Sequence, residues 1–96
     1  MSNPVFEIVT YTVKDPAEAQ KVRSGLKSVL SAFPGFVSWR QFASATSDRR
    51  FVDQVEWDSL ASAQSAQEKF MADPSARELM AQTEEVHAMT HVVEQV

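Results

Sequence analysis

Residues 34–57 read PGFVSWRQFASATSDRRFVDQVEW, and this stretch decides the fold. Its two aromatic-rich ends, Phe36 to Phe42 and Arg50 to Trp57, are typical of strands. The Ser/Thr/Asp-rich residues 44–48 between them favour a turn, so the stretch predicts a β-hairpin. Alternation along the second strand places one apolar set on a single face: Phe51, Val55 and Trp57.

A strand and a helix are predicted before the hairpin. Val5 to Val13 is rich in β-branched and aromatic residues, which indicates a strand. Asp15 and Pro16 then indicate a helix start, because aspartate caps helices and proline suits the first helical position. Apolar residues recur at helical spacing until Pro34-Gly35 ends the helix: Val22, Leu26, Val29, Leu30 and Phe33. The other side of this helix is expected to face solvent with Lys21, Arg23, Lys27 and Ser28.

Two helices and a strand are predicted after the hairpin. Asp58-Ser59 caps a second helix, Asp73-Pro74 starts a short extra helix, and Val86 to Glu94 forms the fourth strand. The order β-α-β-β-α-β is the split βαβ motif. We therefore expect an α+β, ferredoxin-like fold, with a four-stranded antiparallel sheet and helices on one face.

The predicted strands are apolar on both faces. Phe6 and Ile8 alternate with Val5, Val9 and Val13, and Phe36 and Phe42 alternate with Val37 and Trp39. Because the helices cover only one face of such a sheet, the other apolar face needs a second cover. The simplest cover is another copy of the chain across a two-fold axis, so a homodimer is expected.

The composition of the chain limits the kinds of partner and chemistry that it can have. The 96 residues suffice for one domain. The formal net charge of −4 argues against nucleic acid, whose backbone requires a clustered basic surface. The chain has no cysteine, which excludes disulfides and thiolate chemistry. Neither a signal peptide nor a membrane-spanning segment is visible, so we expect a cytoplasmic protein without a membrane partner.

The segments Pro34-Gly-Phe-Val-Ser-Trp-Arg40 and Val55-Glu-Trp-Asp-Ser59 resemble the antibiotic biosynthesis monooxygenase family. Its stand-alone members start the second strand with proline, glycine and phenylalanine and close the third with tryptophan. The likeness spans Val5 to Val93, and residues 1–96 are expected to form one such domain. The resemblance implies a dimeric α+β barrel.

The family also implies two kinds of activity. Some members oxidise phenolic or anthrone-like molecules without metal or flavin, and others degrade haem. Haem-degrading members use an asparagine, a tryptophan and a histidine, where this chain has Val9-Thr10, Ala66 and residues 76–79. Since none of the three is kept, haem degradation is not expected.

His87 and His91 are the only histidines. Four residues apart, they are expected to share a face of the fourth strand, at a separation of about 13 Å that is too great for one metal ion. His91 is the candidate general base, because an imidazole titrates near working pH. His87 is a candidate for substrate binding. The alternative is that both are core or interface histidines.

The second catalytic candidate is Tyr11. Its strand is central in this topology, so its hydroxyl is expected to be buried and to need a partner. That partner is either a phenolic substrate or a backbone carbonyl, and the structural role is favoured.

Three further side chains are predicted to bind substrate. Trp39 and Trp57 present flat surfaces suited to an aromatic ligand. For Trp39 the alternative is a dimer contact, and for Trp57 the alternative of core packing is favoured. Met89, together with Met71 and Met80, is expected to line an apolar space between helices and sheet. Arg40 is expected either to orient an anionic substrate or to form an ion pair with Asp53 or Glu56 across the hairpin, and the ion pair is favoured.

Two functional hypotheses follow from the resemblance and these residues. The first is a cofactor-independent monooxygenase that holds a small quinol- or anthrone-like aromatic in a cleft between helices and sheet. His91 would remove a proton, and the resulting anion would react directly with oxygen. The alternative is a non-catalytic domain, for binding a small ligand or for interaction, on the same dimeric scaffold. Neither hypothesis requires a metal or cofactor.

Overall fold

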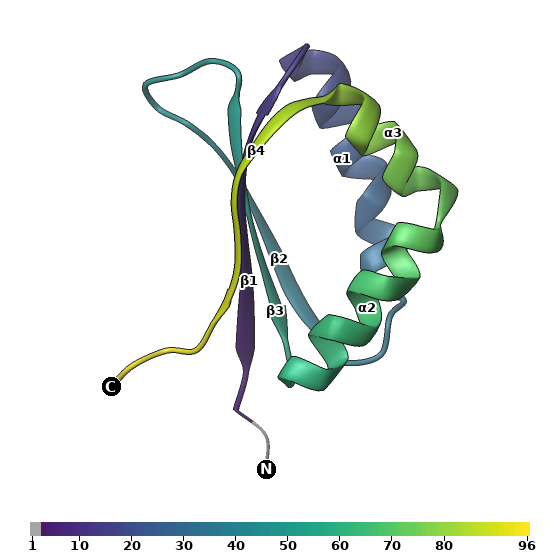
Figure 1. Ribbon diagram of the computed structural model, residues 1–96, viewed down its shortest axis with the longest axis vertical. Coiled ribbons are helices and arrows are strands. Elements are labelled where there is room, and N and C mark those ends of the chain that lie inside the picture. Colours follow the sequence, from purple (N-terminus) through teal and green to yellow (C-terminus); the bar gives the residue numbers. More distant parts are fainter. Residues whose placement is uncertain (1–2) are drawn as a thin grey trace.

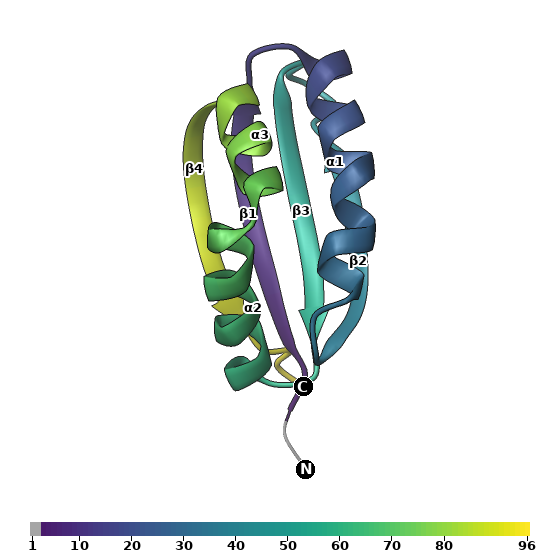
Figure 2. The same cartoon turned by 90° about the vertical axis from the view of Figure 1, so that its right-hand side faces the viewer.

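A computed structural model describes residues 3–96 of the chain (Figure 1). Its elements are β1 (Val5–Val13), α1 (Pro16–Ser31), β2 (Phe36–Ala43), β3 (Arg50–Trp57), α2 (Leu60–Ala72), α3 (Pro74–Gln82) and β4 (Thr83–Val92). The strands pair antiparallel in the order β2-β3-β1-β4. All three helices lie on one face of the sheet (Figures 1 and 2). The predicted α+β, ferredoxin-like fold is therefore confirmed.

Within residues 3–96, no helix is both long enough and apolar enough to span a bilayer.

The helices begin at the predicted capping residues. Asp15 Oδ1 accepts hydrogen bonds from the backbone N–H groups of Ala17 and Glu18 at 3.0 and 3.2 Å. Ser59 caps α2, and Asp73 caps α3 through the N–H of Ser75 at 2.9 Å. Each such cap contributes about 1 kcal/mol to helix stability. α2 and α3 form two helices because Pro74 disfavours the helical conformation at Asp73, whose backbone is extended (φ −84°, ψ 137°).

The strand ends differ from the prediction in two places. β2 reaches Ala43, one residue further than expected. β4 occupies Thr83–Val92 rather than residues 86–94, because its first residues pair with Thr12 and Val13 of β1. The acidic pair Glu84-Glu85 conceals this start in the sequence. An edge strand accommodates such charges because one of its sides remains in solvent.

A β-bulge corrects the predicted faces of β2. The register of β2 against β3 shifts between Phe36 and Ser38, so one extra residue stands at Val37. Phe36 therefore packs on the helix side with Trp39, against the expected alternation. Its ring meets that of Trp57 edge-on, with centroids 5.7 Å apart.

The turn from α1 into β2 requires glycine at position 35. Gly35 has φ +88°, and a Cβ there would overlap the side chains of Ser62 and Asp58. We expect Gly35→Ala to lower the free energy of unfolding by about 1–3 kcal/mol, measured by urea denaturation. The matched control is Gly25→Ala in α1, where an added Cβ meets no atom within 4 Å. That change should stabilise the helix by about 0.4–1 kcal/mol, and equal effects at the two glycines would contradict this account.

The core between helices and sheet is divided into two clusters. One joins β1 and the start of β3 to the helices and contains Tyr11, Val13, Ala19 and Phe51. The other joins the end of β3 to α2 and contains Val55, Trp57, Ala63 and Ala66. The space between the two clusters is only partly filled, and it forms the candidate site.

Candidate functional site

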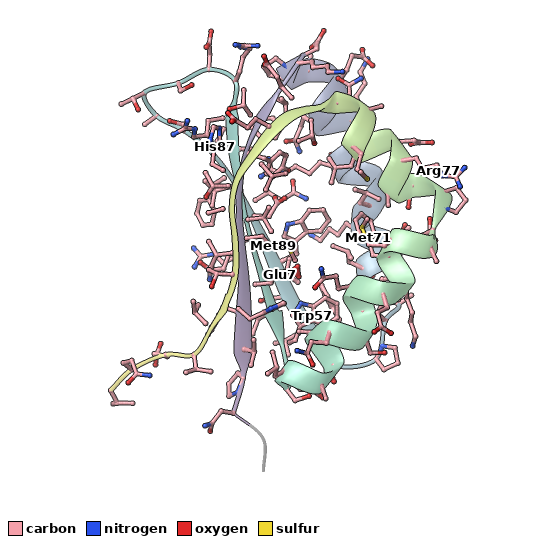
Figure 3. All side chains as sticks on the ribbon, in the orientation of Figure 1. Glu7, Trp57, Met71, Arg77, His87 and Met89 are labelled. Atoms are coloured by element: carbon pink, nitrogen blue, oxygen red, sulfur yellow. The ribbon has the colours of Figure 1, made fainter. Side chains whose placement is uncertain are left out.

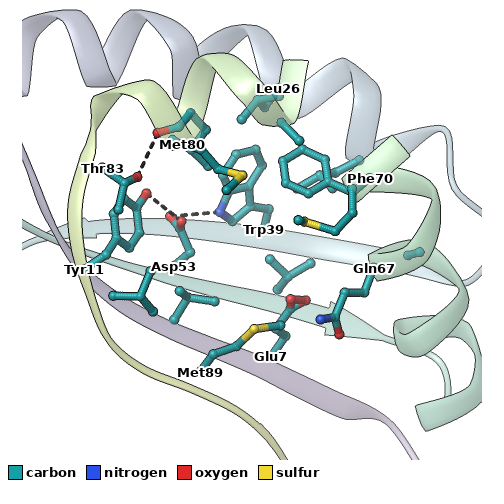
Figure 4. A pocket seen from close by; sticks show the side chains of 18 of the residues that line it. Glu7, Tyr11, Leu26, Trp39, Asp53, Gln67, Phe70, Met80, Thr83 and Met89 are labelled. Atoms are coloured by element: carbon teal, nitrogen blue, oxygen red, sulfur yellow. Dashed lines mark hydrogen bonds between the residues drawn. The ribbon is translucent and has the colours of Figure 1, made fainter. Parts of the chain in front are cut away.

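An open cavity of about 400 Å³ lies between the sheet and the helices, a size suited to a small organic ligand (Figure 4). It exists because the inward positions of α2 and α3 hold small residues, Ala66 and Ala76, where a filled core would place large ones. Glu7, Val9 and Val55 contribute to the sheet side of its wall. The helix side is apolar and includes Leu26, Leu30, Phe70 and Leu79.

The cavity opens between β4 and the α2–α3 pair. Met71, Met80, Val86 and Met89 line it and are 44–59% exposed, so they surround the opening. Met71 and Met89 extend from opposite sides of this gap (Figure 3). The prediction that Met71, Met80 and Met89 line an apolar space between helices and sheet is confirmed. Methionine side chains adapt to ligands of different outline.

A buried polar network crosses one end of the cavity. Asp53 Oδ1 accepts a hydrogen bond from Arg23 Nε at 2.8 Å and lies 2.7 Å from Arg23 Nη2. Tyr11 donates its hydroxyl proton to Asp53 Oδ2 at 2.7 Å, and Trp39 Nε1 donates to Oδ1 at 3.2 Å (Figure 4). Arg23 Nη2 also donates to the backbone carbonyls of Phe42 and Val52. Every member of the network is thereby fixed in place.

Two sequence predictions are corrected by this network. Arg23 was expected on the solvent side of its helix, yet it is 2% exposed and spans from α1 to β3. Arg40 was expected to pair with Asp53 or Glu56, but Asp53 faces the helices, where Arg23 neutralises it. The Arg40 guanidinium instead lies 5.5 Å from the ring centroid of Phe42. Asp53 is out of reach because it and Arg40 lie on opposite faces of the sheet. Glu56 shares the face of Arg40, but within residues 3–96 no ion pair joins the two.

Tyr11 is held in its protonated form. Burial raises the pKa of Tyr11 above its ordinary value of 10.0, and the carboxylate of Asp53 raises it further. A phenol in this state does not act as a base near neutral pH. Its proton is already donated to Asp53, so Tyr11 would have to release that carboxylate before donating to a ligand. The partner of the buried hydroxyl is thus a carboxylate, where a substrate or a carbonyl was expected.

Glu7 brings a second carboxylate into the cavity. Burial raises the pKa of Glu7 above its ordinary value of 4.5; the neighbouring His91 and the Trp57 indole offset part of this effect, while Asp53 adds to it. His91 pairs directly with Glu7 across the β1–β4 ladder, so both side chains point to the same face of the sheet. Within residues 3–96, Trp57 Nε1 and His91 Nε2 are the buried side-chain nitrogen or oxygen atoms that have no hydrogen-bond partner. Glu7 and Trp57 lie next to each other (Figure 3).

The two histidines lie on opposite faces of the sheet, and the expectation of a shared face was wrong. The register of β1 against β4 shifts between Thr10 and Tyr11, which leaves His87 as an extra residue. His87 consequently points away from the helices, where its Nε2 is hydrogen-bonded to Thr12 Oγ1 at 2.6 Å and accepts from Arg50 Nη2 at 3.3 Å (Figure 3). His91 lies on the helix side beside Glu7.

The predicted site residues are therefore brought together only in part. Tyr11, Trp39, Trp57 and Met89 line the cavity. His91 adjoins it through Glu7, and His87 lies outside it on the opposite face. Sequence reasoning missed the acidic residues of the site. A signal for them was present, because Glu7 and Asp53 each stand at a position of the apolar face of a strand.

Fold and site together define a class of protein: a small split-βαβ domain with an apolar cavity between its helices and its sheet. Comparisons with family models and with curated proteins each gave no match. Solved structures do match over the whole chain. SnoaB from Streptomyces nogalater, a cofactor-independent oxygenase, has 21% identity and a TM-score of 0.76, covering 99% of this chain and 94% of its own.

Two further structures are similar to this chain. A Bordetella bronchiseptica protein, named provisionally as an antibiotic biosynthesis monooxygenase, has 14% identity and a TM-score of 0.81, with 99% of this chain and 100% of its own covered. A Bacteroides thetaiotaomicron protein of unknown function has 11% identity and a TM-score of 0.80, with 98% and 100% covered. The chain therefore has the fold of the antibiotic biosynthesis monooxygenase-like proteins.

Proposed function

We propose that this protein is a cofactor-independent monooxygenase that acts on a small, electron-rich aromatic molecule held in the cavity. The observation that carries the proposal is Glu7, a partly buried carboxylate on the wall of a largely apolar cavity of suitable size. A carboxylate with a raised pKa is a better proton acceptor than a solvated one, because burial destabilises its charged form. The fold shared with SnoaB supports the same class of reaction.

In the proposed reaction, a quinol- or anthrone-like substrate lies against Trp39 and Trp57. Glu7 accepts the proton released when a substrate O–H or C–H bond breaks. His91, directly opposite Glu7, is the second group able to hold that proton, since its Nε2 has no partner. The carbon of the substrate anion forms a bond to dioxygen, and the resulting peroxide anion takes the proton back from Glu7. The hydroperoxide then loses its remaining carbon-bound hydrogen and its outer oxygen as water, which leaves a carbonyl group on the product. One oxygen atom stays in the product and the other leaves as water, so dioxygen is the only oxidant needed.

Tyr11 and Met89 have supporting roles in this proposal. Tyr11 donates a hydrogen bond to Asp53 at one end of the cavity, and Asp53 in turn accepts one from the Trp39 indole. Met89 borders the opening and contacts the outer edge of the ligand. His87 lies away from the cavity, so its proposed contribution to substrate binding requires a substrate that extends around the sheet edge.

Oxygen uptake by the metal-free protein with a panel of quinols, anthrones and catechols tests the function. Protein-dependent uptake that falls strongly in His91→Ala supports the oxygenase. The absence of uptake across the panel, with ligand binding retained, supports the alternative of a small-ligand-binding domain.

We also propose that the protein works as a homodimer formed through the sheet face opposite the helices. Phe6, Ile8 and Val52 lie on that face, and Phe42 and Val92 at its edges are 41% and 40% exposed. A central apolar face of this kind favours a second copy as its cover.

Ile8→Asp places a charge at the centre of this proposed interface. In size-exclusion chromatography with light scattering, we expect the unaltered protein to elute as a dimer and the variant as a monomer, because burying an unpaired charge is strongly unfavourable. The control is Leu60→Asp, which changes an exposed apolar residue on the helix side and should leave the dimer intact. A monomeric unaltered protein would refute the proposed interface.

A further inference from the structure

The charged side chains that line the cavity are acidic. Among the described residues, those lining it include four acidic side chains, Glu7, Asp53, Glu84 and Glu85, and no lysine or arginine. Arg23 neutralises Asp53 from behind at 2.7 Å. Arg49 pairs with Glu84 at 2.8 Å, and both side chains are about half exposed. Within residues 3–96, Glu7 forms no ion pair with a lysine or arginine. The imidazole of His91, directly opposite Glu7 on β4, offsets only part of the burial that raises the pKa of Glu7.

Glu7 also determines which chemical group a ligand can present. An ionised carboxylate only accepts hydrogen bonds. A second anion beside it in a poorly hydrated cavity would be repelled, whereas a hydroxyl or an ammonium group would donate to it. An aromatic ring without a donor would leave Glu7 desolvated and unpaired, which is unfavourable.

We propose that the cavity selects aromatic ligands that carry a hydrogen-bond donor for Glu7 and no negative charge. The inference deepens the proposed function, since it rests on the cavity being the ligand site. It does not depend on any reaction with oxygen. It states that phenols, benzylic alcohols and benzylic amines are ligands and that aromatic carboxylates are excluded.

The test compares probes that differ only at one substituent of a naphthalene ring. Isothermal titration calorimetry near neutral pH measures the dissociation constants of 1-naphthylmethanol, 1-naphthylmethylamine, 1-(methoxymethyl)naphthalene and 1-naphthoate. The alcohol is a neutral donor, the amine is a cationic donor, the ether has no donor, and the carboxylate is an anion. We expect the alcohol or the amine to bind at least about tenfold more tightly than both the ether and the carboxylate. Whichever of the two binds more tightly identifies the donor as neutral or cationic.

The Glu7→Gln variant tests whether Glu7 is the residue responsible for this selectivity. A glutamine amide is neutral and both donates and accepts, so the discrimination against 1-naphthoate should fall to less than about threefold. Glu78→Gln removes a charge from the exposed side of α3, outside the cavity, and should retain the full discrimination. Equal binding of alcohol and carboxylate, unchanged selectivity in Glu7→Gln, or no binding of any probe would overturn the inference.

The outcome is separable from that of the oxygenase proposal. The expected selectivity without oxygen uptake would leave this inference standing and reject the oxygenase. Oxygen uptake without the expected selectivity would reject this inference alone.

Discussion

Asp53→Ala is expected to lower the free energy of unfolding by about 3–5 kcal/mol, because it leaves the Arg23 guanidinium buried without its counter-charge. Arg23 is 2% exposed and Asp53 6% exposed, so water cannot readily replace the lost carboxylate. The substitution also removes the acceptor for the Tyr11 hydroxyl and the Trp39 indole. Urea denaturation followed by circular dichroism measures the change.

Two further variants distinguish the buried ion pair from a general effect of losing an acidic residue. Asp48→Ala removes a carboxylate from the exposed turn before β3 and should change stability by less than about 0.5 kcal/mol. The double variant Asp53→Ala with Arg23→Met removes both charges and should be more stable than Asp53→Ala alone. If Asp53→Ala cost no more than Asp48→Ala, the network would not be the stabilising element described here.

Glu7→Gln is expected to reduce the rate of oxygen consumption by about 10²–10⁴-fold for any substrate that the protein oxidises, because it removes the proposed proton acceptor. Glutamine has nearly the same shape, so the cavity and its opening should persist. The measurement is the initial rate at an oxygen electrode, with Glu78→Gln as the control that should keep full activity. A Glu7→Gln rate within about threefold of the original would remove Glu7 from the mechanism and leave His91 as the base.

The stability of Glu7→Gln shows whether an activity loss reflects unfolding. Burial raises the pKa of Glu7 above 4.5, so the folded state binds this proton more tightly than the unfolded state does. The ionised side chain therefore destabilises the fold at neutral pH, and this penalty disappears as the pH falls towards 4.5. We expect Glu7→Gln to melt at a higher temperature than the unaltered protein at neutral pH, with the difference shrinking on acidification. A lower melting temperature at neutral pH would contradict the conclusion that the neighbours of the partly buried Glu7 carboxylate compensate its burial only in part.

The sequence predicted the fold well because its signals were local. Asp15 and Asp73 each precede a proline at a helix start, and Pro34-Gly35 ends α1, so helix starts and stops were readable from short segments. The alternation of Phe51, Val55 and Trp57 gave the buried face of β3 directly.

The errors arose where pairing between distant segments changed the local pattern. Bulges at Val37 and His87 reverse the alternation, and neither is marked by a glycine or proline. Simple parity therefore placed Phe36 and His87 on the wrong faces. A bulge is set by the register of the neighbouring strand, which a single segment does not encode.

The aromatic residues of the site were predicted from the sequence, but its charged residues were not. Trp39 and Trp57 are candidates for ligand-binding surfaces because of their residue type alone. The functions of Arg23 and Asp53 depend on an ion pair 30 positions apart in the chain, between a helix and a strand. A charged residue in an apolar strand pattern, such as Glu7 between Val5 and Val9, was the one local signal for the polar side of the cavity.

The most direct test of the central claim follows the oxygen atoms. Metal-free protein is incubated with a quinol or anthrone under oxygen-18-labelled dioxygen, and the product is analysed by mass spectrometry. The account predicts product carrying a single labelled atom, formed at a rate proportional to protein concentration and strongly reduced in Glu7→Gln. Product without label, or labelled product formed equally fast without the protein, would contradict a monooxygenase reaction in this cavity.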